Sequence, residues 1–184
     1  MHKDTKGKIA EQLAELLKTK KLEDITIKQL VDACGISRQT FYYYYEDILS
    51  VMEYWVKRVV EQNLADSLAA NDLRTVIRSF VARIVQDRST IRKMIESRYR
   101  AECERIFRNG IMTYLRQLFQ QKWPNPQLIP SDIHAFLSFH AYGLIGLVLE
   151  QCTHGEPDVD QLVDQLCRLF SGEMKAQLDC SKQA

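Results

Sequence analysis

Apolar residues recur every three or four positions along most of the chain, the spacing of an amphipathic helix. In the first part this spacing predicts helices over 5–20, 27–34 and 38–45, and a long one over 47–70. Further on it predicts helices over 72–86, 89–121 (with a break near Ser97), 131–151 and 158–178, capped by Asn71 and Ser131 where those segments open. No stretch of useful length alternates apolar and polar residues as a strand does. The pattern predicts an all-α fold of about nine helices.

Residues that start and stop helices are concentrated between 26 and 45. Thr26 and Gln29 have the spacing of a capping box. Gly35 follows the second predicted helix, where a left-handed residue ends a helix, and Ser37 is placed to cap the next one. Two short helices joined by a three-residue turn containing Gly are the pattern of a helix-turn-helix unit.

This segment resembles the TetR/AcrR family of transcriptional regulators. The resemblance covers roughly residues 5–60 and rests on a Thr before the second helix, Ala-x-Gly-Ile-Ser at residues 33–37, and Thr-aromatic-Tyr at 40–42. Residues 61–184 are similar to the family in architecture, and 139–147 resemble a Gly-containing helix of the branch with dihydroxyacetone-kinase activator-like regulators. The resemblance implies a DNA-binding domain over 1–48, a connecting helix over 47–70, and a ligand-binding and dimerisation domain over 49–184.

The third predicted helix carries the candidate DNA contacts. Phe41 and Tyr45 are four residues apart and are expected to face the core, which turns Arg38 and its neighbours outward. Arg can bond bidentately to guanine and Gln to adenine, and the resemblance places Thr26 among the phosphate contacts. The full set of expected contacts is Thr26, Lys28, Arg38, Gln39, Thr40, Tyr42, Tyr43 and Tyr44. The alternative is that the run of tyrosines only fills the space between helices.

Three positions depart from the family pattern. Gln39 replaces a frequent Gly, Tyr44-Tyr45 replaces a frequent His-Phe pair, and Ile48 stands where the family often has a Lys that meets a phosphate. Losing one such phosphate contact would lessen the salt slope of DNA binding by about one unit.

Charge is nearly balanced, with 25 Lys and Arg against 24 Asp and Glu. The DNA-binding segment is no exception, because residues 1–60 carry 10 basic and 9 acidic side chains. This balance excludes a sequence-blind polyelectrolyte binder. It is compatible with a regulator that places a few cations on one short helix pair.

Other chemistry is sparse. Five Cys without a CxxC pair favour reduced thiols and a cytoplasmic protein. His134 and His140 are six residues apart, the wrong spacing for one metal face, so we expect no metal, no cofactor and no enzyme activity. The longest apolar stretch, Phe136–Leu149, contains His140 and is too short to cross a bilayer, so no membrane is expected.

The second half of the chain supplies two further sets of candidates. A polar-lined effector pocket is expected from Arg98, Tyr99, Glu102, Tyr114, His134 and Tyr142, the alternative being a solvated helix face. The two last helices have more apolar surface than one small core needs, which favours a homodimer. The expected interface is Tyr142, Gly143, Gly146, Leu147, Leu162, Leu166 and Leu169, the alternative being packing within one chain.

The resemblance implies a sequence-specific regulator that binds a pseudo-palindromic, double-stranded DNA operator as a dimer. It further implies repression released by a small-molecule effector, with activation as the open alternative. A helical small-molecule-binding protein or enzyme with a vestigial DNA-binding unit, and a protein-interaction module using the same helical face, are the rival hypotheses.

Overall fold

The computed structural model describes residues 4–124, 127–153 and 158–173, and within them every helix and turn belongs to an all-α fold without strands. The predicted fold class is confirmed. In chain order the elements are α1 (Thr5–Leu17), the 3₁₀ helix η1 (Leu22–Asp24), α2 (Ile27–Cys34), α3 (Arg38–Tyr44), α4 (Ile48–Ala69), α5 (Leu73–Gln86), α6 (Arg88–Ile95), α7 (Arg100–Lys122), α8 (Pro130–Thr153) and α9 (Val159–Ser171).

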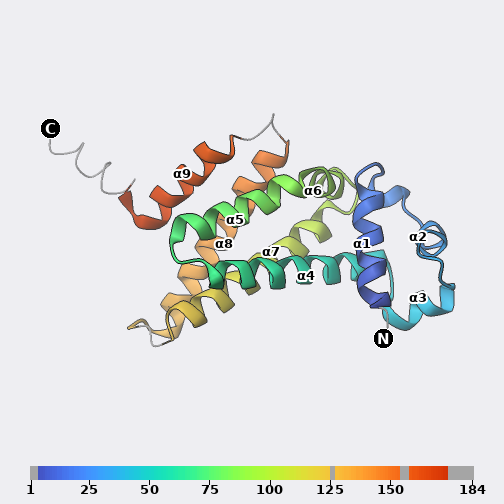
Figure 1. Cartoon of the computed structure of the whole chain (residues 1–184), viewed down its shortest axis with the longest axis horizontal. Helices are drawn as coiled ribbons and strands as arrows, with labels where there is room; N and C mark the ends of the chain where they lie inside the picture. The colour runs from blue at the N-terminus through green and yellow to red at the C-terminus, as the bar shows by residue number, and fades with distance from the viewer. Residues whose placement is uncertain (1–3, 125–126, 154–157, 174–184) are drawn as a thin grey trace.

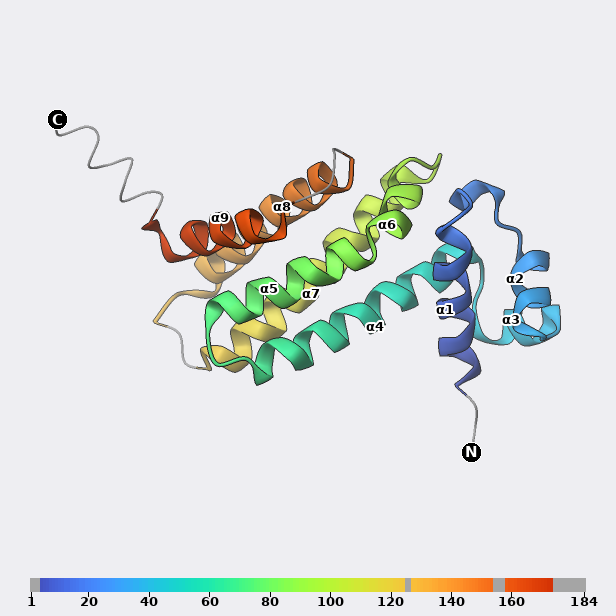
Figure 2. The same cartoon turned by 45° about the horizontal axis from the view of Figure 1, so that its top comes forward.

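The molecule is elongated, with α1, α2 and α3 gathered at one end (Figure 1). From that end α4 and α7 run alongside each other toward the opposite end, where α8 and α9 lie (Figure 2). α4 packs against α7, α5 against α9, and α7 against α8. The long helices α4 and α7 therefore connect the N-terminal helices mechanically to the rest of the protein.

One apolar cluster holds the N-terminal helices together. Leu13 of α1, Leu30 of α2 and Phe41 of α3 are fully or almost fully buried in it. Cys103 and Ile106 of α7 belong to the same cluster. The expected domain boundary at 48–49 therefore crosses a continuous core, and it stays a prediction.

A second cluster lies between α5, α8 and α9, around Val81, Leu144 and Val163. Leu162 and Leu166 are buried within it. The apolar stripe of α9 is therefore covered by α5 of the same chain, which leaves little of these two leucines for a second chain, and the predicted dimer interface stays a prediction.

Several helix ends differ slightly from the sequence prediction. α1 ends at Leu17 rather than near 20, because the chain must turn there to bring Leu22 into the core. The cap of α5 is Asp72, whose carboxylate accepts the Thr75 N–H at 2.8 Å, and not Asn71.

The two last helices also begin or end differently from the prediction. α8 begins at Pro130, whose missing N–H suits a first helical position, so Ser131 lies inside the helix. α9 ends at Ser171, before Gly172 at φ 79°, and the stretch 174–178 expected to continue it lies outside the described residues.

α8 is longer than its apolar stretch suggested. Its 24 residues make it the one helix in the described part of the chain that is long and apolar enough to cross a membrane by length and composition. A core helix of a protein without any membrane contact passes the same test. Only 22% of its most apolar window is buried within this chain, so much of α8 has no partner here.

Candidate nucleic-acid interface

Local hydrogen bonds build the helix-turn-helix unit. The Gln29 N–H donates to Thr26 Oγ1 at 3.2 Å and the Thr26 N–H donates to Gln29 Oε1 at 3.0 Å, which is the predicted capping box. Ser37 caps α3 by accepting the Thr40 N–H at 3.0 Å, and the Ser37 and Thr40 hydroxyls lie 2.9 Å apart. Both helices therefore begin where the sequence predicts.

Gly35 makes the turn between α2 and α3. Its φ of 66° and ψ of 40° place it in the left-handed region, which side chains other than Gly strongly disfavour. The N–H of Ile36 then donates to the Val31 carbonyl at 3.1 Å and closes the end of α2.

Replacing Gly35 by alanine is expected to lower the free energy of unfolding by about 1–2 kcal/mol, the backbone cost of a left-handed residue with a Cβ atom. A methyl group there would meet no heavy atom within 4 Å, so the whole effect would come from the backbone. Urea unfolding followed by circular dichroism measures it. Gly35→Asn should cost less, because Asn tolerates this conformation, and equal stability of glycine and alanine forms would contradict the argument.

Two contacts from α1 fix the orientation of the unit. Lys8 Nζ donates to the Cys34 carbonyl at the end of α2 at 2.8 Å. The Tyr45 hydroxyl donates to the Lys6 carbonyl at 2.8 Å, and burial raises the pKa of this phenol. α3 is therefore held at both ends, through its turn and through Tyr45.

α3 has one buried face and one open face, as predicted. Phe41 and Tyr45 are buried, whereas Arg38, Gln39 and Tyr43 are exposed, with 81% of Tyr43 accessible. The remaining expected contacts divide into exposed and half-buried residues. Thr26, Lys28 and Tyr42 are exposed, and Thr40 and Tyr44 are half-buried.

The exposed face of this unit has cations without acidic partners. Neither Arg38 nor Lys28 forms an ion pair with the residues that the structure describes. Ile48 is the first residue of α4 and packs its half-buried side chain against the N-terminal core. Its side chain serves packing and cannot replace the cation that the family often has at this position.

The six residues expected to form one effector pocket are not brought together. Arg98 and Tyr99 line a hollow of about 280 Å³ beside η1 and the start of α4. His134 lines another hollow, between α7 and α8, and Tyr142 is exposed. Glu102 is half-buried and lines none of these hollows. The helical structure is interrupted around Ser97, between α6 and α7, and the turn there places Arg98 and Tyr99 next to the N-terminal helices.

Tyr114 is the member of that set that reaches an interior cavity. This cavity of about 90 Å³ lies among helices α4 to α8 and has mainly apolar walls, including Trp55 and Phe80. The Tyr114 hydroxyl is hydrogen-bonded to Ser67 Oγ at 2.7 Å, and burial raises its pKa. The sequence contains few cues to this cavity, because its walls come from five helices, α4 to α8, whose lining residues span 55–148.

An ion pair lies at the edge of the same cavity. Arg83 Nε donates to Asp87 Oδ2 at 2.9 Å, and both side chains are partly buried. Desolvation raises the pKa of Asp87, although the Arg83 guanidinium acts in the opposite direction. Their spacing of four residues was the available sequence signal for this pair.

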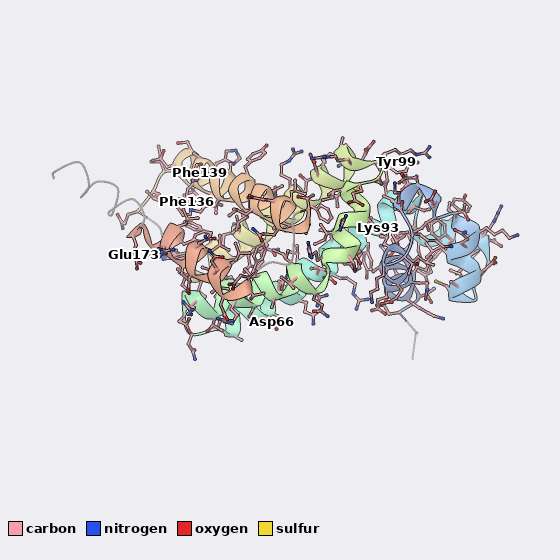
Figure 3. The ribbon with its side chains drawn as sticks, turned by 90° about the horizontal axis from the view of Figure 1, so that it is seen from above. Asp66, Lys93, Tyr99, Phe136, Phe139 and Glu173 are labelled. Carbon is pink, nitrogen blue, oxygen red and sulfur yellow. The ribbon has the colours of Figure 1, made fainter. Side chains whose placement is uncertain are left out.

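The expected dimer residues fall into two groups. Tyr142, Gly143, Gly146 and Leu169 are exposed and Leu147 is half-buried, whereas Leu162 and Leu166 are buried within the chain. Phe136 and Phe139 were not among the predicted dimer residues, yet they extend the exposed apolar surface along α8 (Figure 3). Among the described residues, no group of three His, Cys, Asp or Glu side chains could hold a metal ion.

Neither a protein-family model nor a curated protein matches the sequence. Solved structures do match in shape. A dihydroxyacetone kinase operon activator, DhaS, has a TM-score of 0.65 at 16% identity, covering 94% of this chain and 97% of its own. The TetR family repressor AlkX from Dietzia sp. has a TM-score of 0.60 at 12% identity, covering 93% and 95%.

The chain has the TetR-family fold. A Clostridium perfringens putative fatty acid metabolism regulator is similar as well, with a TM-score of 0.51, 13% identity, and coverage of 88% of this chain and 95% of that chain. In the TetR-family fold of this chain, the helix-turn-helix and the apolar helices α8 and α9 stand at opposite ends (Figure 1). This shared shape agrees with the expectation taken from residues 26–45.

Proposed function

We propose that this protein is a sequence-specific transcriptional regulator that binds double-stranded DNA through α3. The observation that carries the proposal is the exposed face of α3, held rigidly by the buried Phe41 and Tyr45 and presenting Arg38, Gln39 and Tyr43 to solvent. Structures with the same fold are named as an operon activator and a repressor, which supports a regulatory role without an enzyme activity.

The side chains on this face suit a major groove. The Arg38 guanidinium can donate two hydrogen bonds to one guanine, and the Gln39 amide can bond both edge atoms of an adenine. The exposed hydroxyls of Thr26 and Tyr42 are the proposed phosphate contacts, and Lys28 supplies a positive charge. Base readout and phosphate contacts therefore come from separate residues.

A gel-shift experiment with the DNA upstream of the protein's own gene tests the proposal at stated salt concentrations. A regulator should shift one short fragment well below the protein concentration that shifts scrambled DNA. Equal binding to all fragments, or no binding at low salt, would instead support a small-molecule-binding protein with a vestigial unit or a protein-interaction module.

Replacing Arg38 by alanine is expected to weaken binding to the selected operator by about 1–3 kcal/mol and to relax one base position. The measurement is a binding isotherm against the operator and its single-base variants. Lys28→Ala is the matched control, because a phosphate contact should weaken all sequences alike and lower the salt slope by about one. An unchanged isotherm for Arg38→Ala would remove this residue from base readout.

The operator-binding form is proposed to be a homodimer. The exposed surface of α8 contains Phe136, Phe139, Tyr142, Gly143 and Gly146 along one face, and Leu169 of α9 is exposed as well. Large aromatic residues beside glycines allow two helices to approach closely and to bury a wide apolar area. A two-fold dimer would present two α3 helices to the two halves of a pseudo-palindrome.

The effector site is proposed to be the cavity among helices α4 to α8. Its mainly apolar walls favour a small, largely apolar molecule. Trp55 and Val56 of α4 form part of the wall, and α4 follows α3 directly in the chain. A molecule that favours one position of α4 would favour one spacing of the two α3 helices in the dimer.

Repression released by the effector is the proposed direction of control. A reporter gene behind the operator tests the sign, because deleting the regulator should raise expression of a repressed gene. A fall in expression on deletion would establish activation instead.

A further inference from the structure

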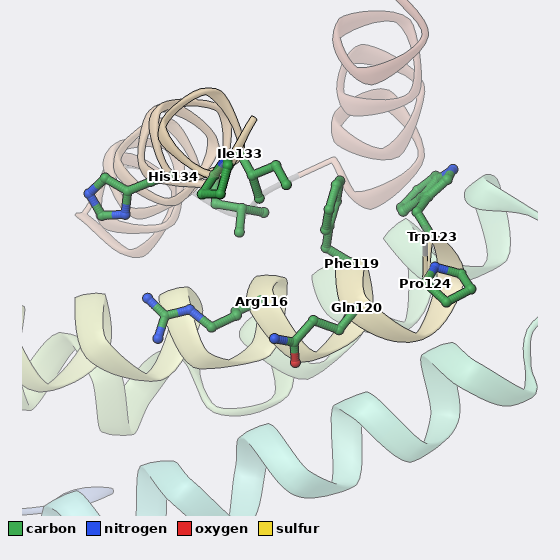
Figure 4. A pocket seen from close by; sticks show the side chains of 9 residues that line it. Arg116, Phe119, Gln120, Trp123, Pro124, Ile133 and His134 are labelled. Carbon is green, nitrogen blue, oxygen red and sulfur yellow. The ribbon is translucent and has the colours of Figure 1, made fainter. Parts of the chain in front are cut away.

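A second hollow lies at the end of the molecule farthest from α3, between the last turns of α7 and the first turns of α8 (Figure 4). Its volume is about 370 Å³, within the range of small-molecule sites. It shares no lining residue with the cavity proposed for the effector. Binding here is therefore a separate question from DNA binding and from effector release.

The polar lining of this hollow is basic or neutral. Arg116 and Gln120 of α7 and His134 of α8 line it, with His134 at the same end of the hollow as Arg116 (Figure 4). No Asp or Glu is among its lining residues. A group with hydrogen-bond acceptors and negative charge would complement this set.

Arg116 differs from the other arginines of α7. Arg100 pairs with Glu104 at 2.6 Å, Arg105 pairs with Glu53 at 3.2 Å, and Arg108 lies over the Tyr142 ring. Arg116 forms no ion pair with any residue in the described part of the chain. Its guanidinium is therefore available for a bidentate contact with a carboxylate.

The remainder of the hollow is lined by apolar side chains, two of them aromatic. The rings of Phe119 and Trp123 lie 5.4 Å apart, and Ile133 points toward α7 from the opposite helix (Figure 4). Trp123 is 58% exposed, so its ring is accessible to a ligand in the hollow. These walls would cover the body of a small planar molecule.

We propose that this hollow is a binding site for a small carboxylate with an aromatic body. The carboxylate would be held by Arg116, with Gln120 as an additional donor, and the ring would pack between Ile133 and the Phe119–Trp123 pair. The charge and the aromatic rings line one hollow, which is the combination that an aromatic acid requires.

The proposed dimer leaves this site accessible. At 3.6 residues per turn, Ile133, His134 and Leu137 lie on the face of α8 roughly opposite to that of Phe139 and Gly146. A second chain centred on Phe139 would therefore lie on the other side of α8 from Ile133 and Leu137, and Phe136, which contacts Phe119 of the hollow, marks the edge between the two surfaces. Binding can be measured on the full chain in whatever oligomeric state it adopts.

Three probes of nearly equal size test the charge requirement: benzoate, neutral benzamide and cationic benzylamine. Isothermal titration calorimetry on the full chain should show binding for benzoate and at least about tenfold weaker binding for the other two, about 1.4 kcal/mol. Equal binding of all three, or no benzoate binding at millimolar concentration, would overturn the proposal.

The position of bound benzoate is tested by tryptophan fluorescence. The chain has only two tryptophans, Trp55 in the interior cavity and Trp123 in this hollow. In the Trp55→Phe variant, benzoate should change the emission of Trp123. In Trp123→Phe, the emission of Trp55 should stay constant. A change in Trp55 alone would place the ligand in the interior cavity and overturn the assignment.

Arg116→Gln is expected to weaken benzoate binding at least about tenfold and to leave benzamide binding unchanged. Arg108→Gln is the matched control, because it removes the same charge from the same helix outside the hollow. Both residues lie outside the apolar clusters, so both variants should fold. Equal losses in the two variants would show a general charge effect and would reject Arg116 as the binding residue.

Discussion

Replacing Phe41 by alanine is expected to lower the free energy of unfolding by about 3–5 kcal/mol. Phe41 is fully buried in the N-terminal cluster, and its ring contacts Tyr42 and Tyr45 with centroids 5.5 and 6.0 Å away. Removing the ring would leave a cavity between α3 and the rest of the cluster, which rigid helices could fill only in part. Urea unfolding, followed by the helical signal in circular dichroism, measures the change in the free energy of unfolding.

The control is Tyr43→Ala, which removes an aromatic ring from the exposed face of the same helix. Because Tyr43 is 81% exposed, stability should change by less than about 0.5 kcal/mol, while operator binding should weaken. The two variants therefore separate folding from recognition. Similar destabilisation by both would show that the two faces of α3 do not have the roles assigned to them.

The helix-turn-helix unit was predictable because its signals are local. The capping bonds of Thr26 and Ser37 each span three residues, and the turn depends on the conformation of Gly35 alone. The inward and outward faces of α3 then follow from helical spacing. No knowledge of distant helices was needed for these features, which is why their positions agreed with the structure.

The effector pocket could not be predicted in the same way, because cavity walls come from helices that meet only in three dimensions. Ser97 illustrates the difficulty. Its hydroxyl donates to the Met94 carbonyl at 2.6 Å and accepts the Tyr99 N–H at 3.2 Å, which turns the chain at the α6–α7 corner. That turn moves Arg98 and Tyr99 away from Tyr114, although the sequence led us to expect all three in one pocket.

The dimer residues were predicted from apolarity, and apolarity alone does not distinguish an internal contact from an external one. α9 shows the distinction. Arg74 pairs with Asp164 and Arg78 with Asp160, each at 2.6 Å, so two ion pairs along one side of the helix pair join α9 to α5. On another face of α9, Leu162 and Leu166 are buried inside the chain. α8 lacks such a cover over Phe139, and its exposed face is the better candidate.

Replacing Phe139 by glutamate is expected to dissociate the proposed dimer without unfolding the chain. Phe139 is 77% exposed, so the monomer has no need of its ring. A two-fold interface would lose two rings and gain two carboxylates without partners. Each of the two substituted residues should weaken the free energy of dimerisation by about 2 kcal/mol or more. Light scattering during size exclusion should change from about twice 21.5 kDa to the mass of one chain.

Leu73→Glu is the matched control, because Leu73 is 46% exposed but lies at the start of α5 and not on the α8 face that carries Phe139. It should keep the dimer mass and the operator affinity. Phe139→Glu should lose tight operator binding as well, because one chain contacts one half-site and the second α3 no longer adds to the affinity. If the Phe139→Glu variant remains a dimer, the interface does not lie on this face of α8. If it is a monomer that still binds the full operator tightly, pairing through α8 is not needed for recognition.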